Sequence, residues 1–317
     1  MASIHRSTFI ASRIKGCVMK RIPLLTIVLI TAWVSGGCDT EVARQVVPRP
    51  GRVLAIREAL RGDEEAATSE TTEPVMQKPT EFVTLRGQFK MQGTPPANPV
   101  LSVTKDTAVC NPNNVTIHAT QVVVDPQSQG IKNMVVMIEV PDDWVHPDAK
   151  GATDEVKFDQ KACEFVDHVF GMQATETLEI LNSDPIAHNT KMEPRRNTAS
   201  NVNVPGGTST TYKPTAGEKD PFEVTCSIHP WMKAYILIRS NGYYAISGDD
   251  GSFEIANVPA GAPIQVRVWH ETQPSGVSPE TVNGEPVSWR KGEFTMTLDP
   301  TDESKNELAV VVDASKF

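Results

Sequence analysis

Residues 224–238, VTCSIHPWMKAYILI, carry the strongest functional signal in this chain. β-branched and aromatic residues before Cys226 and after Lys233 predict two strands, and the turn between them carries three metal-binding side chains. Cys226, His229 and Met232 offer a thiolate, an imidazole and a thioether within seven residues. Soft donors of this kind suit a soft metal, so the segment predicts a strand–loop–strand metal site.

A second segment, ETLEILNSDPIAHNTKM at residues 176–192, supplies a fourth donor. A predicted strand ends at Asn182, a turn follows, and His188 comes next. His188 and Cys226 are 38 residues apart, so they meet only if the chain returns, as it does in a Greek-key sandwich. Two imidazoles, a thiolate and a weak axial thioether are typical ligands of type 1 copper. The predicted copper ligands are His188, Cys226, His229 and Met232. Zinc at the same ligands is the alternative.

These segments resemble the motifs of the cupredoxins, the superfamily of plastocyanin, azurin and amicyanin. Residues 182–189 resemble the motif around the first histidine ligand. CSIHPWM at residues 226–232 resembles the short Cys-x-x-His-Pro-aromatic-Met loop of amicyanin-like members. The match covers roughly residues 157–239, and Met192 departs from it where the family often has an aromatic residue. The resemblance implies single-electron transfer to or from a redox protein partner.

The resemblance also implies where electrons leave the site. In cupredoxins the downstream histidine lies near the surface within an apolar patch. Here that histidine is His229, and Pro230 and Trp231 are its expected apolar surround and the expected docking residues. The alternative for Trp231 is a buried core position.

The N-terminus predicts export. Residues 19–38, MKRIPLLTIVLITAWVSGGC, combine basic residues, a 13-residue apolar stretch and small residues before a cysteine. This resembles a bacterial lipoprotein signal, with Met19 as an alternative start. We expect acylation of Cys38, a periplasmic or cell-surface location and membrane contact through the lipid anchor only. Plain secretion is the alternative.

Apart from Cys17 in the leader and Cys38, the cysteines are Cys110, Cys163 and Cys226. In an oxidising compartment, three thiols suggest one disulfide and one cysteine kept for other work. We therefore expect a Cys110–Cys163 disulfide and a free Cys226. The alternative is a second metal site formed by Cys163 and His168.

Short β-branched runs punctuated by Gly, Pro and Asn follow residue 81 and predict an all-β chain with two sandwiches. PVLSVT at 99–104 and NVTIHATQVVVD at 114–125 are among the candidate strands. Residues 243–270 resemble a carboxypeptidase regulatory-like (transthyretin-like) sandwich, which implies no chemistry. The predicted domains are a leader (1–37), a disordered tether (38–80), a cupredoxin-like domain (81–240) and the second sandwich (241–317). Residues 81–140 fit the second sandwich equally well, in which case the copper segment is an insertion between its strands.

The net charge and the residue types present argue against some classes of function. A formal net charge of −9 argues against a nucleic-acid partner. No paired carboxylates or Ser/His/Asp set stand out, so we expect a protein that is not an enzyme. The alternatives to an electron carrier are a cell-surface scaffold or carbohydrate-binding lipoprotein with a structural or absent metal, and a protein of periplasmic copper storage or delivery.

Overall fold

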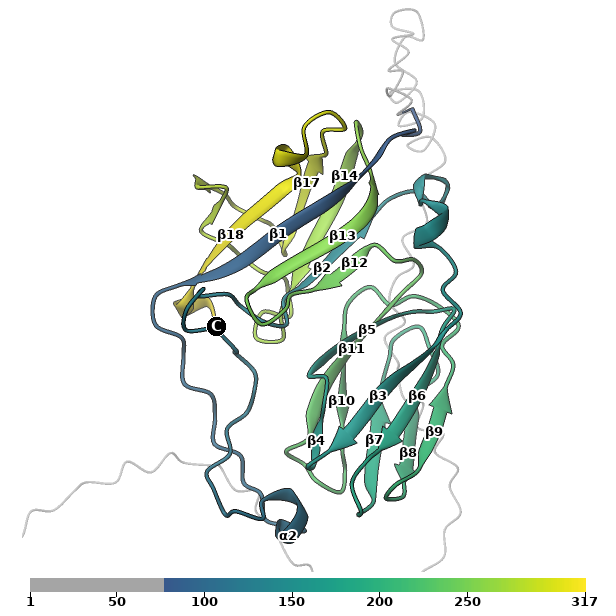
Figure 1. Ribbon diagram of the computed structural model, residues 1–317, viewed down its shortest axis with the longest axis vertical. Coiled ribbons are helices and arrows are strands. Elements are labelled where there is room, and N and C mark those ends of the chain that lie inside the picture. The colour runs from purple at the N-terminus through teal and green to yellow at the C-terminus, as the bar shows by residue number, and fades with distance from the viewer. Residues whose placement is uncertain (1–76) are drawn as a thin grey trace, which may run out of the picture. The chain divides into compact units, whose positions relative to one another are not determined.

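The computed structural model describes residues 77–317. The predicted signal peptide, Cys38 and nearly all of the tether lie outside the described residues. Within residues 77–317, strands make up most of the regular structure (Figure 1). None of the helices there has the length and hydropathy of a membrane span. The all-β prediction is confirmed.

Two β-sandwiches share the described chain. The outer sandwich contains one sheet in the order β13-β1-β18-β15-β16 and another in the order β12-β2-β14-β17. Its strands are β1 (Phe82–Gln92), β2 (Val135–Glu139), β12 (Tyr244–Ile246), β13 (Ser252–Pro259), β14 (Pro263–Trp269), β15 (Thr281–Val282), β16 (Glu285–Pro286), β17 (Glu293–Thr297) and β18 (Glu307–Asp313). Leu85, Phe89 and Ile138 are among the buried residues of its core.

The inserted sandwich lies between β2 and β12 in the sequence. Its sheets have the orders β5-β11-β10-β7-β8 and β4-β3-β6-β9. The strands are β3 (Glu155–Lys161), β4 (Glu164–Phe165), β5 (Val169–Gln173), β6 (Thr177–Asn182), β7 (His188–Met192), β8 (Ser200–Val204), β9 (Ser209–Tyr212), β10 (Phe222–Thr225) and β11 (Lys233–Arg239). Phe158, Ile180 and Ile236 are fully buried in its core.

Strand pairing distinguishes the two placements of residues 81–140. β1 pairs with β13 and β18, and β2 pairs with β12 and β14. Both strands therefore belong to the outer sandwich, and the segment that carries the candidate ligands is inserted between its strands. The resemblance of the outer sandwich to a regulatory-like domain stays a prediction.

Helical structure is short. The only α-helix of the described residues is α2 (Thr107–Cys110), and the 3-10 turns are Asp142–Trp144, Pro147–Ala149, Glu303–Asn306 and Ala314–Lys316. Helix α2 lies in the strap, which we define as residues 93–129, between β1 and the return to the outer sandwich. Figure 1 shows the strap leaving β1 and carrying α2.

The strap contains the two candidate strands whose prediction is wrong. Residues 99–104 and 114–125 form only isolated bridges, Val100 with His118 and Val124 with Ile131. Side chains satisfy part of the strap backbone instead. The Asn98 amide donates to the Val122 carbonyl at 2.7 Å, and its carbonyl oxygen accepts from the Val122 N–H at 3.0 Å.

Candidate metal centre

Strand register brings the predicted ligands together. β7 and β10 are antiparallel, with Met192 opposite Val224 and Lys191 opposite Thr225. His188, at the start of β7, therefore lies beside the loop that follows Thr225. β10 and β11 are a hairpin closed by that loop, in which the Met232 N–H donates to the His229 carbonyl at 2.9 Å.

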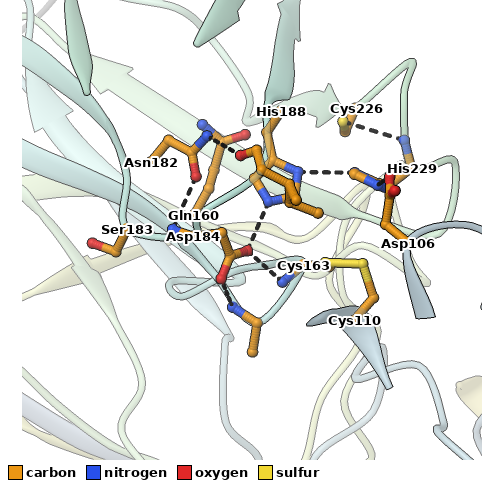
Figure 2. Close-up of polar contacts among 12 residues, drawn as sticks. Asp106, Cys110, Gln160, Cys163, Asn182, Ser183, Asp184, His188, Cys226 and His229 are labelled. Carbon is orange, nitrogen blue, oxygen red and sulfur yellow. Dashed lines mark hydrogen bonds and ion pairs between the residues drawn. A yellow bond between two sulfur atoms is a disulfide. The ribbon is translucent and has the colours of Figure 1, made fainter. Parts of the chain in front are cut away.

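Three candidate ligand atoms meet in the interior. His188 and His229 are 0% exposed and Cys226 is 2% exposed. One ligand atom from each of the three lies within 4.8 Å of the other two. The two Nδ1 atoms are only 2.9 Å apart (Figure 2). The histidines thus point their Nδ1 atoms at each other, next to the sulfur.

Carboxylates hold the far side of both imidazoles. Nε2 of His188 lies 2.7 Å from Asp184, and Nε2 of His229 lies 2.9 Å from Asp106. A carboxylate only accepts hydrogen bonds, so each Nε2 carries a proton. Each neutral imidazole then has an unprotonated Nδ1, the arrangement found in carboxylate–histidine–metal triads.

This geometry fits a metal ion. In their neutral forms His188 and His229 present two lone pairs to each other at 2.9 Å, beside the Cys226 sulfur. Such a contact is repulsive unless a proton or a cation lies between the nitrogens. A thiolate and two imidazoles are suitable ligands for copper and also for zinc.

Backbone amides stabilise the sulfur of Cys226. The Asn189 N–H donates to Sγ at 3.3 Å and the His229 N–H donates at 3.4 Å. Burial would raise the pKa of the Cys226 thiol, but in the metal-free protein these amides and a His188 ring that is protonated at Nδ1 outweigh burial and lower it. The site therefore favours the thiolate, the form that binds metals.

The surroundings of His188 and Asp184 also favour the charged forms of both side chains. Burial works against both charges, yet hydrogen bonds with Cys226 and Asp184 raise the pKa of His188. The pKa of Asp184 is lowered despite burial, by the Cys163 amide, His188 and the Ala162 amide. Those two amides donate to Asp184 at 2.8 and 2.7 Å. The carboxylate is thereby fixed in position behind His188.

Asn189 ties the ligand loop to β7. Its side-chain oxygen accepts from the Ser227 N–H at 3.1 Å, while its amide group donates to Asn201 at 2.7 Å. Met232, the predicted axial ligand, is 1% exposed and belongs to the same core cluster as Cys226. The Cys226 N–H donates to the Met232 carbonyl at 3.3 Å, which closes the loop.

A disulfide attaches the strap to the inserted sandwich beside this site. Cys110 and Cys163 are bonded, with their Cα atoms 5.1 Å apart, while Cys226 is free (Figure 2). Asp106, just before α2, has a positive φ of 49°, a conformation that Asp tolerates better than most residues. The disulfide occupies Cys163, which argues against a second metal site at Cys163 and His168.

The expectation that His229 lies near the surface is wrong. The strap brings Asp106 against its Nε2, and the side chain has no exposed area. Pro230 is exposed and Trp231 is half-buried. The Trp231 ring centroid lies 5.1 Å from that of His229, and its Nε1–H donates to the Cys163 carbonyl at 3.2 Å. Trp231 is therefore a partly exposed aromatic side chain in contact with His229.

Sequence reasoning missed both carboxylates. Asp184 stands four residues before His188 in the quoted turn, and this closeness in the sequence could have identified it as a partner of His188. Asp106 is 123 residues from His229 in a segment without a recognisable pattern, so no local signal marks it.

Comparisons with known proteins give partial structural likenesses. No protein family and no curated protein matches the sequence. The Cu-containing nitrite reductase of Thermus scotoductus SA-01 is 19% identical over 26% of this chain, with a TM-score of 0.24. The chain spans only 22% of that reductase. A Cu(I) amicyanin mutant is 11% identical over 27% of this chain and 82% of its own, with a TM-score of 0.25. A reduced amicyanin mutant is 15% identical over 33% of this chain and 98% of its own, with a TM-score of 0.24. The solved structures similar to part of this chain therefore include cupredoxins.

Proposed function

We propose that this protein binds one copper ion through His188, Cys226, His229 and Met232 and carries single electrons. Copper bound there would supply a one-electron couple between Cu(II) and Cu(I). The chain's own residues hold the two imidazoles in fixed tautomers, keep the sulfur as a thiolate and exclude water from the site. A ligand set fixed by the fold rearranges little when the charge of the ion changes.

The observation that carries this proposal is the buried pair of facing Nδ1 atoms, 2.9 Å apart beside a free cysteine. Both Nε2 positions are committed to carboxylates. A storage or delivery protein needs ready metal exchange, whereas this site is buried and covered by a disulfide-attached strap. Those features favour a resident copper ion over a copper cargo.

We propose the rest of the predicted assignment with it. The carrier is an exported lipoprotein, acylated at Cys38 and tethered by residues 39–80. A redox protein docks at Pro230 and Trp231. Exposure of Pro230 and the Trp231–His229 ring contact support this face as the electron route.

The visible spectrum of the Cu(II)-loaded full chain tests the copper assignment. A Cu(II)–thiolate bond gives intense visible absorption, so we expect a strong band in the wild type and none in Cys226→Ser. His270→Gln is the control, because His270 is a buried histidine with no contact to these ligands. A band that survives Cys226→Ser would refute the assignment. Binding of one zinc ion in preference to copper would favour the structural-metal alternative.

A further inference from the structure

A cavity of about 230 Å³ lies beside the ligand loop. Its apolar walls include Leu101, Phe165 and Trp231, and its polar walls include Thr120 and His168. Phe165 and His168 come from the inserted sandwich, and Leu101 and Thr120 come from the strap. The strap and the inserted sandwich therefore enclose a partly apolar cavity. One of its lining residues, Trp231, contacts His229, a candidate copper ligand.

The polar wall of the cavity belongs to a three-residue chain of hydrogen bonds. Nε2 of His168 pairs with the carboxylate of Glu271, whose side chain is 3% exposed. Nδ1 of His168 lies 3.2 Å from the Thr120 hydroxyl. His168 belongs to the inserted sandwich, Glu271 to the outer sandwich and Thr120 to the strap.

The donor and acceptor roles in this chain are determined by Glu271. The carboxylate accepts, so His168 Nε2 carries the proton and Nδ1 of the neutral ring is an acceptor. The Thr120 hydroxyl must then donate to Nδ1. Its oxygen keeps lone pairs that can accept a hydrogen bond from a hydroxyl in the cavity. A proton arriving at Thr120 can pass on to Nδ1 of the ring whose Nε2 is paired with Glu271.

We propose that this cavity binds a small hydroquinone that donates electrons to the copper site. An aromatic ring suits the Phe165 and Trp231 walls, and a phenolic O–H can donate to the exposed hydroxyl oxygen of Thr120. Phenols release an electron readily only when their proton leaves as well. The cavity meets both requirements. Thr120 and His168 in one wall can accept the proton, and Trp231 in another wall lies next to His229. This inference rests on the copper proposal above.

The first O–H bond of the hydroquinone would break at Thr120, and its proton would reach Nδ1 of His168. Its electron would pass to the oxidised copper ion that His188, Cys226 and His229 would hold. The redox protein would then take this electron, and His168 would release the proton to solvent. A second identical step would complete the conversion of one hydroquinone to one quinone, with two protons and two electrons released in total.

Binding is tested first without copper. In the metal-free full chain, added phenol should shift the Trp231 indole N–H resonance saturably in ¹H–¹⁵N spectra. Leu101→Trp, which fills the cavity, should abolish that shift. The same shift in both proteins, or no saturable shift in the wild type, would overturn the proposal. Because this readout needs no copper, it stands or falls independently of the copper assignment.

Electron donation is tested in the copper-loaded chain by following loss of the visible band after adding hydroquinone. The rate should saturate with hydroquinone in the wild type. Thr120→Val has nearly the same shape but no hydroxyl, and should slow reduction on the order of 100-fold, a typical contribution of positioned proton transfer. His118→Gln is the matched control: His118 lines the same cavity, but its Nδ1 bonds the Asn98 carbonyl. A Thr120→Val rate equal to the control rate would overturn the proposal.

Discussion

The carboxylate of Asp106 lies 2.9 Å from Nε2 of His229, although the two residues are 123 positions apart and belong to different parts of the fold. Asp106 is in the strap, and His229 is in the ligand loop of the inserted sandwich. The same imidazole presents Nδ1 to His188 at 2.9 Å. The strap thus completes a symmetrical arrangement in which a carboxylate supports each histidine.

Asp106→Asn should weaken Cu(II) binding. Asn can still accept a hydrogen bond from Nε2, but it lacks the negative charge that increases the basicity of the imidazole. Changes of this type cost about 10–100-fold in metal affinity. The reduction potential should rise, because Cu(II) needs the lost charge more than Cu(I) does. Competition titration with a copper chelator measures the affinity, and voltammetry measures the potential.

The control for Asp106→Asn is Asp249→Asn, which removes the same charge from an exposed residue paired with Lys132 in the outer sandwich. Asp249→Asn should leave both quantities unchanged. Equal effects of the two substitutions would mean that only the net charge matters, and Asp106 would then have no positioning role.

The acid stability of the metal-free protein should depend on Asp184. Its pKa in the folded state lies below its ordinary value of 3.8, because hydrogen bonds from the Cys163 amide and His188 outweigh burial. A carboxyl group whose pKa falls on folding stabilises the protein above its unfolded-state pKa. That contribution disappears as the pH falls through the folded-state pKa. We expect the free energy of unfolding to decline below about pH 4.

Asp184→Asn should flatten that acid decline, measured by urea unfolding between pH 2 and pH 6. Asp250→Asn is the comparison, since its pKa is also lowered but by its local Ser252 hydrogen bonds at the surface. If Asp184→Asn retains the full wild-type slope, the buried His188–Asp184 pair does not govern acid stability.

Removing the disulfide should detach the strap. The Cys110–Cys163 bond closes a loop over 53 positions. On the chain-entropy account, losing it lowers the free energy of unfolding by about 4 kcal/mol. The double variant Cys110→Ser/Cys163→Ser should also let Asp106 leave His229, so copper exchange with a chelator should become faster. Denaturant unfolding and chelator kinetics measure the two effects.

The two effects of the disulfide can be separated with Asp106→Asn in the intact chain. That variant keeps the cross-link, so its unfolding free energy should remain close to the wild type while its copper affinity falls. Unreduced peptide mapping must also recover the Cys110–Cys163 link from the wild type. Free thiols at both positions would show that the strap is held by other contacts.

The sequence allowed the four candidate ligands to be proposed because strand periodicity and short spacing are local signals. Cys226, His229 and Met232 lie in one hairpin, and the order of strands relates them to His188. The strap could not be predicted in the same way. Its β-branched residues resemble strands, yet Val100 and Val115 are 64% and 57% exposed and form no ladder. Its position depends on a disulfide and on side-chain contacts with distant residues.

Trp231→Ala should slow electron transfer while leaving the copper spectrum nearly unchanged. The indole lies against His229, with ring centroids 5.1 Å apart, and is itself partly exposed. Because His229 is fully buried, an electron that leaves through this histidine must cross one of its neighbours, and Trp231 is the aromatic neighbour. Electron self-exchange between oxidised and reduced protein, measured by NMR line broadening, requires no knowledge of the partner.

Trp231→Phe separates the two roles of this side chain. Phe keeps an aromatic ring beside His229 but cannot donate to the Cys163 carbonyl, a bond of 3.2 Å in the wild type. If Trp231 serves electron transfer, Phe should retain most of the exchange rate and Ala should lose it. If both variants lose the visible band together with the rate, Trp231 supports the ligand loop and not the electron route. If neither variant changes the rate, electrons leave by another face, and the docking role of Pro230 and Trp231 is refuted.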